Sequence, residues 1–132
     1  ETAEATRLPL LAYREGCNMA DCVFCKSVAA SSPSTKVYED ESCLAFRDLE
    51  PKAPTHILVI PKQHIQSADA VTAENSALVA HIFTGIPGSM KEQGVTGGYR
   101  IITNAGPDAG QTVPHLHFHV LAGVEMGWDP VG

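Results

Sequence analysis

The sequence has little positive charge, no long apolar run and no secretory leader pattern. Its 132 residues carry 9 Lys and Arg against 15 Asp and Glu, a net charge of −6 with the six His neutral. Nucleic acids and anionic membranes attract basic surfaces, so this balance argues against both as partners. No apolar run is longer than Ile57–Ile60, whereas a membrane-spanning helix needs about 20 residues. Glu1–Arg14 contains no continuous apolar core of the kind that a signal peptide requires, so we expect a cytoplasmic protein.

The chain length indicates one folded domain, because single domains commonly run to about 100–200 residues. We expect residues 1–14 to form an N-terminal arm and residues 15–132 to form the single domain. A domain of this size buries enough surface to fold without a disulfide or a metal. With 44% hydrophobic and 18% charged residues, the composition excludes a disordered chain.

Cysteine is scarce, and only Cys17, Cys22, Cys25 and Cys43 are present. We expect reduced thiols in a cytoplasmic protein. Cys22 and Cys25 form a C-x-x-C pair, which is typical of half a zinc site or of a redox pair, but no buried strand precedes it as a redox pair requires. On these residues alone, the pair is equally compatible with a metal site and with buried thiols. Cys17 and Cys43 have no evident partner residues, and we expect ordinary thiols there.

Hydrophobic periodicity predicts an α+β domain. A short helix is expected from Asp21 to about Ala30, and a long one from Thr72 to about Lys91, kinked or broken at Pro87. The expected strands, of which 55–60 is apolar on both faces and therefore central, are 36–39, 43–49, 55–60, 99–105 and 115–121. Their short links and order imply a five-stranded antiparallel sheet with the long helix on one face.

Three histidines alternate with apolar residues in residues 115–121, which read HLHFHVL. In a strand, His115, His117 and His119 lie on one face and the apolar residues on the other. A plain solvent-facing edge would be served equally well by Thr, Lys or Glu, so three imidazoles favour a functional site. Adjacent imidazoles disfavour double protonation, which suits nucleophilic or acid–base chemistry near neutral pH, or metal binding.

The loop at residues 104–113 precedes this segment and contains two glycines, with Asn104, Gln111 and Thr112 as side-chain donors. No Lys or Arg occurs between Ile101 and Val124. We therefore expect backbone N–H groups, hydroxyls, amides and imidazoles to hold any phosphate bound here. The chain has no G-x-G-x-x-G and no P-loop lysine motif, which argues against dinucleotide-fold and kinase-type sites.

Residues 115–121 resemble the HφHφHφφ motif of the histidine-triad (HIT) superfamily, in which φ is apolar. Further stretches are similar to its nucleotide-binding (Hint) branch: 38–41, 44–48, 53–62, 98–100 and 109–113. The resemblance implies a symmetric homodimer with a sheet continued across the interface, and a purine nucleotide bound beside each triad. It also implies hydrolysis of nucleoside phosphoramidates through a nucleotidyl-histidine intermediate, in a cycle that needs no metal.

The same resemblance implies roles for individual residues. His117 corresponds to the nucleophile, and His119 and His56 flank it and orient the phosphate. The other implied nucleotide contacts are Phe24 and Phe46 at the base, Asp48 and Leu49 at the ribose and base, and Asn104, Gly110, Gln111 and Thr112 at the phosphate and reacting groups. In relatives the C-terminal tail reaches the partner subunit's active site, which implies a partner contact for Trp128.

Two residues depart from the family pattern near this site. Thr112 stands where Ser is usual; it keeps the hydroxyl, but its methyl group narrows the leaving-group side. Asp129 stands where close relatives have an uncharged Pro, and it either alters the preference for the leaving amine or is simply solvated.

The resemblance also bears on the C-x-x-C pair. Relatives with C-x-x-C at this place bind zinc, and complete the site with the His of a P-K-x-H segment and the first triad His. Two thiolates and two imidazoles suit a closed tetrahedral structural site, so we predict zinc on Cys22, Cys25, His64 and His115. The alternative is that both thiols are small buried hydrophobes and His64 is a capping residue. As a zinc ligand, His115 would be structural and not an acid or base.

Two other functions are alternatives to phosphoramidate hydrolysis. One is hydrolysis of dinucleoside polyphosphates, but the sister branch with that activity usually has Gln in place of the first triad His, so His115 argues against it. The other is a non-catalytic nucleotide-binding or scaffold protein, which the full set of catalytic side chains disfavours. His81 lies mid-helix beside Ile82 and Phe83, and we expect it to serve packing or a dimer face and not to be a ligand.

Overall fold

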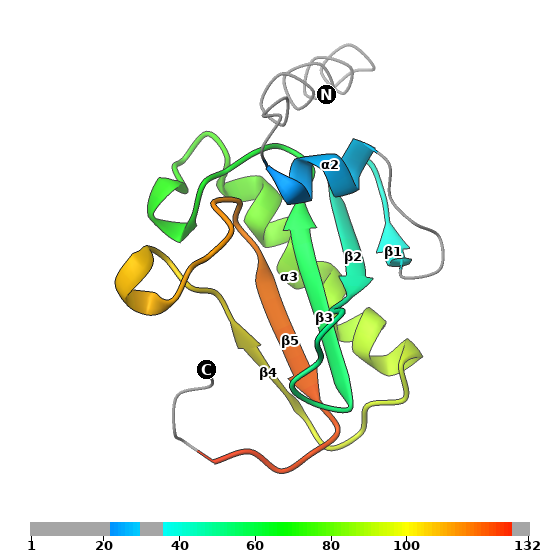
Figure 1. Cartoon of the computed structure of the whole chain (residues 1–132). Coiled ribbons are helices and arrows are strands. Elements are labelled where there is room, and N and C mark those ends of the chain that lie inside the picture. The colour runs from blue at the N-terminus through cyan, green and yellow to red at the C-terminus, as the bar shows by residue number, and fades with distance from the viewer. Residues whose placement is uncertain (1–21, 30–35, 128–132) are drawn as a thin grey trace.

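The protein forms an antiparallel sheet with one long helix across its face (Figure 1). The computed structural model describes residues 22–29 and 36–127. Within these residues the elements are α2 (Val23–Ala29), β1 (Lys36–Glu39), β2 (Cys43–Arg47), β3 (Thr55–Pro61), η1 (Ala68–Ala70), α3 (Ser76–Glu92), β4 (Tyr99–Ile102), η2 (Pro107–Ala109) and β5 (Phe118–Ala122). The strands pair in the order β1-β2-β3-β5-β4, with every pair antiparallel. The α+β fold predicted from the sequence, with a five-stranded antiparallel sheet and one main helix, is confirmed.

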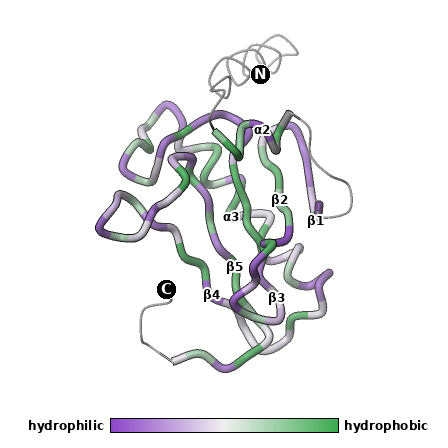
Figure 2. Tube along the Cα trace, in the orientation of Figure 1, coloured by the Kyte–Doolittle hydropathy of each residue, from purple (hydrophilic) through white to green (hydrophobic). Residues whose placement is uncertain are grey.

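β3 is the central strand because both of its faces are apolar and covered. It pairs with β2 on one side and β5 on the other. Ile57 and Val59 pack into the core beneath α3, whereas Leu58 and Ile60 pack on the opposite face, with residues of α2. Figure 2 shows hydrophobic residues along the central strands and hydrophilic residues gathered in the loops. The central place predicted for residues 55–60 is confirmed.

α3 crosses behind the sheet in Figure 1 and is held there by Ile82, Ile86 and Met90, which lie on one face of the helix and are buried. The sequence predicted a kink or break at Pro87, and the break is wrong, because α3 continues through this residue. Proline removes one backbone hydrogen bond. The ring of Pro87 is exposed, and burial of Ile86 and Met90 on either side keeps the helix against the sheet. Within the described residues, no helix is long and apolar enough to cross a bilayer.

α3 also begins later than predicted, at Ser76 and not at Thr72. Residues 72–75 form a turn instead, in which the Thr72 amide donates to Asn75 Oδ1 at 2.7 Å. The side chain of Asn75 thus competes with the helical backbone, as short polar side chains do at helix starts.

β5 begins at Phe118, whereas the sequence predicted a strand from His115. β4 is shorter than predicted and provides no ladder partner for residues 115–117. Instead, the amide of Leu116 donates to the carbonyl of Ile65 at 2.6 Å. The predicted alternation of faces still holds, because the apolar residues that alternate with the histidines belong to the core beneath α3: Leu116, Phe118 and Val120.

Candidate functional site

A cleft of about 250 Å³ lies on the sheet face opposite α3. It receives residues from the β2–β3 connection, from β3, from the end of β4 with the loop that follows it, and from β5 with the segment that leads into it. Its lining contains these residues that the sequence analysis selected: Asp48, His56, Asn104, Gly110, Thr112, His117 and His119. The fold therefore gathers most of the predicted site from four separate stretches of chain.

His117 presents an unprotonated nitrogen to the cleft. Its Nδ1 lies 2.7 Å from the backbone carbonyl of His115. Because a carbonyl can only accept, Nδ1 carries the hydrogen, and in the neutral ring Nε2 keeps its lone pair. Burial lowers the pKa of His117, so the ring is neutral at pH 7. The edge of Phe24 packs on this ring with centroids 5.0 Å apart, which fixes its plane.

His119 presents the opposite group, an N–H donor. The Lys52 amide donates to His56 Nδ1 at 2.9 Å, so His56 carries its hydrogen on Nε2. That nitrogen lies 2.9 Å from His119 Nδ1 and donates to it, which leaves the His119 hydrogen on Nε2. One backbone amide thus sets the tautomers of two imidazoles in sequence.

The cleft also keeps these two imidazoles uncharged. Burial lowers the pKa of His119 to about 4, with further lowering from the neighbouring His117 and His56. Burial likewise lowers the pKa of His56, although the Asp48 carboxylate 3.4 Å away opposes this change. Three neutral rings can therefore lie side by side without mutual charge repulsion.

Gln111 supports the loop and does not reach the cleft. Its Oε1 accepts from the Gly106 amide at 2.8 Å, and its Nε2 donates to the carbonyls of Gln66 at 2.8 Å and Val113 at 3.0 Å. It is absent from the cleft lining. The phosphate contact implied for Gln111 therefore has no side-chain basis in this arrangement. Gly110, in contrast, lines the cleft with φ of +86°, where a side chain would be strained.

The residues implied at the base and ribose divide into two groups. Phe24 and Phe46 pack edge to face, with centroids 5.7 Å apart, and neither lines the cleft; Phe24 also packs on His117. Leu49 is 85% exposed beside the rim residue Asp48, so a ligand could cover it. Trp128 lies outside the described residues.

Charged residues that sequence reasoning missed also line the cleft. Lys52 and Glu50 come from the connection between β2 and β3. The sequence analysis considered only residues 101–124, which contain no Lys or Arg, and so did not anticipate Lys52 in the cleft lining. A lysine in a loop between two strands carries no recognisable signal, because only the fold brings it to the triad.

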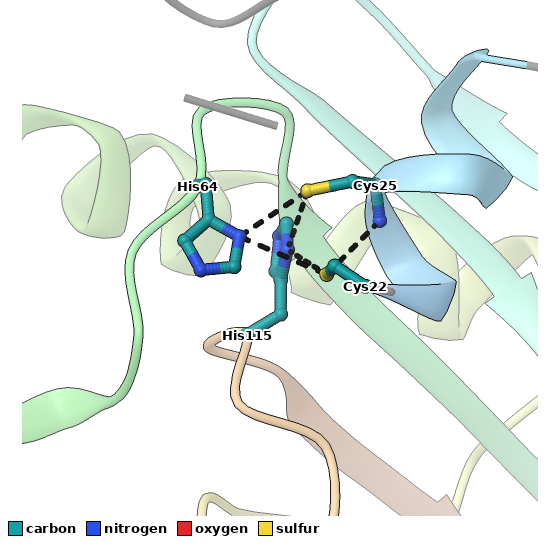
Figure 3. Close-up of side chains that lie close together, drawn as sticks. All are labelled: Cys22, Cys25, His64 and His115. Carbon is teal, nitrogen blue, oxygen red and sulfur yellow. Dashed lines mark hydrogen bonds between the residues drawn. The ribbon is translucent and has the colours of Figure 1, made fainter. Parts of the chain in front are cut away.

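Cys22, Cys25, His64 and His115 form a compact second cluster (Figure 3). Figure 3 shows both sulfurs and both rings facing one another between α2 and the segments after β3 and before β5. The four sulfur-to-Nδ1 distances lie between 3.2 and 3.7 Å. A tetrahedral zinc with ordinary bond lengths holds sulfur and nitrogen about 3.6 Å apart, so the donor geometry fits this ion.

The groups around the cluster also suit a metal. His115 Nε2 donates to the Pro61 carbonyl at 3.0 Å, which leaves the Nδ1 lone pair facing the sulfurs. Such an outer hydrogen bond is what orients a metal-ligating histidine. Burial lowers the pKa of His115 to about 4, so the ring is neutral as a ligand must be. The Cys25 amide donates to Cys22 Sγ at 3.3 Å and so holds this sulfur in place.

Residues 29–126 match the family model described as the HIT domain. The chain therefore belongs to the HIT-domain family. The match begins after Cys22 and Cys25.

Among known proteins, an uncharacterized HIT-like protein of Synechococcus elongatus is 47% identical over 110 residues, which cover 83% of this chain and 96% of that protein. A HIT family hydrolase from Clostridium thermocellum has a similar structure, with a TM-score of 0.80 at 42% identity over 86% of this chain and 99% of its own. A histidine triad protein from Clostridium difficile has a TM-score of 0.78 at 47% identity, covering 83% of this chain and 96% of its own.

Proposed function

We propose that this protein is a hydrolase of purine nucleoside phosphoramidates, of the Hint type. The observation that carries the proposal is the pairing of unlike groups in one cleft: a nitrogen lone pair on His117 and an N–H donor on His119. Substitution at phosphorus uses both groups. The lone pair attacks the phosphorus atom, and the N–H donor stabilises the phosphoryl oxygen on which negative charge develops. The Clostridium thermocellum relative is itself called a hydrolase.

In the first step, His117 Nε2 attacks the α-phosphorus, and a P–N bond to the imidazole forms as the P–N bond to the amine breaks. The amine takes up a proton that the Thr112 hydroxyl in the cleft lining donates and regains from solvent; the water that attacks in the second step returns a proton to solvent, so the cycle balances. His119 Nε2–H donates to a non-bridging phosphoryl oxygen throughout. In the second step, water attacks phosphorus, the bond to His117 breaks, the neutral ring is restored, and the nucleotide leaves with the oxygen of water.

The remaining lining residues suit the substrate's other parts. Asn104 and the backbone at Gly110 can donate to the phosphate, and Lys52 supplies a positive charge nearby. Asp48 can accept from ribose hydroxyls, and the exposed Leu49 beside it can cover the base. Phe24 holds the His117 ring, and Phe46 packs against Phe24.

We further propose that Cys22, Cys25, His64 and His115 bind zinc as a structural ion. Support comes from the ligand distances and from the Pro61 bond to His115. When bound, the ion would supply a rigid anchor and no reactive group, because four protein ligands close its coordination. Its effect on the reaction would pass through the His115 carbonyl, which positions His117.

We also propose a homodimer formed along β4. Within the described residues, β4 has a strand neighbour on one side only, and an open strand edge favours pairing with a second copy. Arg100 of β4 donates to the Gly127 carbonyl at 2.6 Å, which holds the chain just before Trp128 near this edge. A monomeric mass by light scattering would contradict the dimer.

Replacement of His117 tests the enzymatic proposal. We expect His117→Ala to abolish amine release from an adenosine phosphoramidate, with a loss of at least about 10³-fold because the nucleophile is removed. AMP binding, measured by calorimetry, should persist and serves as the folding control. Undiminished release would end the proposal, whereas AMP binding without any turnover in the wild type would favour a scaffold protein. Preference for a dinucleoside polyphosphate over the phosphoramidate would favour the sister activity.

A further inference from the structure

A third group of chemically reactive side chains lies away from the cleft and from the four-residue cluster. It consists of Asp40 in the turn between β1 and β2, Cys43 at the start of β2, and His81 on α3. One carboxylate oxygen, the thiol sulfur and one imidazole nitrogen of these residues lie within 4.8 Å of one another. The expectation that no partner residues surround Cys43 is therefore wrong, whereas the packing or dimer-face role expected for His81 stays a prediction.

The two oxygens of Asp40 have separate surroundings. Oδ1 accepts from the amides of Ser42 at 2.8 Å and Cys43 at 2.9 Å, and so holds the turn. Oδ2 lies 2.6 Å from His81 Nε2 and accepts from the Tyr38 hydroxyl at 2.7 Å. The turn therefore needs only Oδ1, and its geometry does not require a histidine on α3. His81 adds a contact between α3 and this turn, and Cys43, a residue of the core beneath α3, places its sulfur beside them.

We propose that Asp40, Cys43 and His81 form a second divalent-cation site, for zinc or a cation of similar preference. Thiolate, imidazole and carboxylate are the three ligand types that zinc takes in proteins. Burial and the neighbouring Asp40 raise the pKa of the Cys43 thiol to about 12, so the sulfur becomes a thiolate only when a divalent cation binds and neutralises its charge and that of the carboxylate.

A metal site needs ligands shielded from water and a path by which the ion can enter, and the two sides of this group provide one each. Cys43 is 3% exposed, which keeps water from the sulfur. The His81 side chain is 46% exposed and marks the side from which an ion can arrive. Three protein ligands leave a fourth position for water on this open side.

Binding needs a small rearrangement and the release of a proton. Ligand atoms in a tetrahedral zinc site lie about 3.3–3.7 Å apart, so Asp40 Oδ2 and His81 Nε2 must separate slightly while the sulfur moves closer. The Cys43 thiol loses its hydrogen to solvent, and neutral His81 carries its hydrogen on Nδ1. The exposed position of His81 on α3 allows this movement without disturbing the core.

A bound ion would join α3 to the β1–β2 turn. No residue is shared with the four-residue cluster, so the two metals can be removed one at a time. This separation makes the site testable independently of the zinc proposed on Cys22, Cys25, His64 and His115.

The first test is cobalt titration of the metal-free full-length chain carrying Cys22→Ser and Cys25→Ser, which removes the thiolates of the other cluster. We expect a thiolate-to-cobalt charge-transfer band that disappears on adding Cys43→Ser or His81→Asn. The matched control is Glu92→Gln, an exposed ionisable residue on the same helix, which should leave the band unchanged. A folded chain without the band, or a band that survives Cys43→Ser, overturns the proposal.

The second test uses the unaltered cysteines, in case the double variant does not fold. Zinc is measured after dialysis of the wild type, His81→Asn and Glu92→Gln against the same zinc buffer. The wild type and Glu92→Gln should retain one equivalent more than His81→Asn. Equal zinc content in all three proteins overturns the second site, whether or not zinc fills the other cluster.

Discussion

The position of one hydrogen on each imidazole determines what the triad can do. His117 and His119 have the same side chain and lie with ring centroids 5.1 Å apart, yet one offers a lone pair and the other an N–H. The difference comes from their neighbours: a carbonyl fixes Nδ1–H of His117, whereas His56 donates to Nδ1 of His119. Backbone groups at His115 and Lys52 thus assign the two roles before any substrate binds.

Burial of the His119 imidazole in the cleft makes the free energy of unfolding depend on pH. Its pKa is lowered from 6.5 to about 4 in the folded protein. Between these two values the unfolded chain binds a proton that the folded chain does not, so stability falls as the pH falls through this window. We predict that the free energy of unfolding falls less steeply in His119→Gln than in the wild type between pH of about 6.5 and 4.

Denaturant unfolding of both proteins, with zinc in excess, measures this difference. Protonation of other groups and acid release of metal affect the two proteins alike and cancel in the comparison. Parallel pH profiles for the wild type and His119→Gln would show that this imidazole is not neutral and buried in the folded state.

Among the elements, the loop between β4 and β5 depends on a single side chain for its shape. Gln111 connects Gly106, Val113 and Gln66 through three hydrogen bonds, while its neighbours Gly110 and Thr112 face the cleft. It is a positioning residue, because it acts on the substrate only through the backbone beside it.

We predict that Gln111→Glu, which keeps the acceptor for Gly106 but loses both donors, lowers kcat/KM for phosphoramidate hydrolysis by about 10-fold or more. The two lost hydrogen bonds, one exposed to Gln66 and one part-buried to Val113, are together worth about 1–3 kcal/mol. The loss should fall on kcat and KM together, with an unchanged pH profile, because no titrating catalytic group is removed. The matched control is Gln66→Ala, which leaves the Gln66 carbonyl in place; equal losses in both variants would contradict the role.

The spacing of apolar residues was enough to predict the strands and the helix that bury one or both of their faces. β3 is apolar on both faces, α3 repeats Ile82, Ile86 and Met90, and residues 115–121 alternate. Lys52 and the Asp40–Cys43–His81 group could not be predicted this way, because their neighbours are distant in sequence and share no pattern. Gln111 was assigned to the phosphate from its place in a motif, whereas its contacts depend on the Gln66 carbonyl of another loop.

Over the whole molecule, the cluster of Cys22, Cys25, His64 and His115 and the cleft share one short segment of chain. His115 belongs to the cluster, and its carbonyl holds His117 in the cleft. The sheet beneath them is continuous from β2 to β5. Order at the cluster should therefore extend directly to the nucleophile.

We predict that Cys22→Ser removes zinc from this cluster and lowers the free energy of unfolding by about 3 kcal/mol or more, the amount that a ligand at about 100 times its Kd contributes. Amine release should slow as well, because His115 loses its anchor. Metal analysis, denaturant unfolding and turnover of the same samples check this. A Cys22→Ser variant that keeps both the stability and the zinc content of the wild type would contradict a structural ion here.

The stereochemical course at phosphorus tests most directly whether the reaction passes through His117. The substrate is an adenosine phosphoramidothioate of one known configuration at phosphorus, hydrolysed in ¹⁸O-labelled water. Attack by His117 and then by water inverts the centre twice, so we predict net retention of configuration in the adenosine phosphorothioate product. Net inversion would mean that water attacks the substrate directly, and it would contradict the nucleotidyl-histidine intermediate.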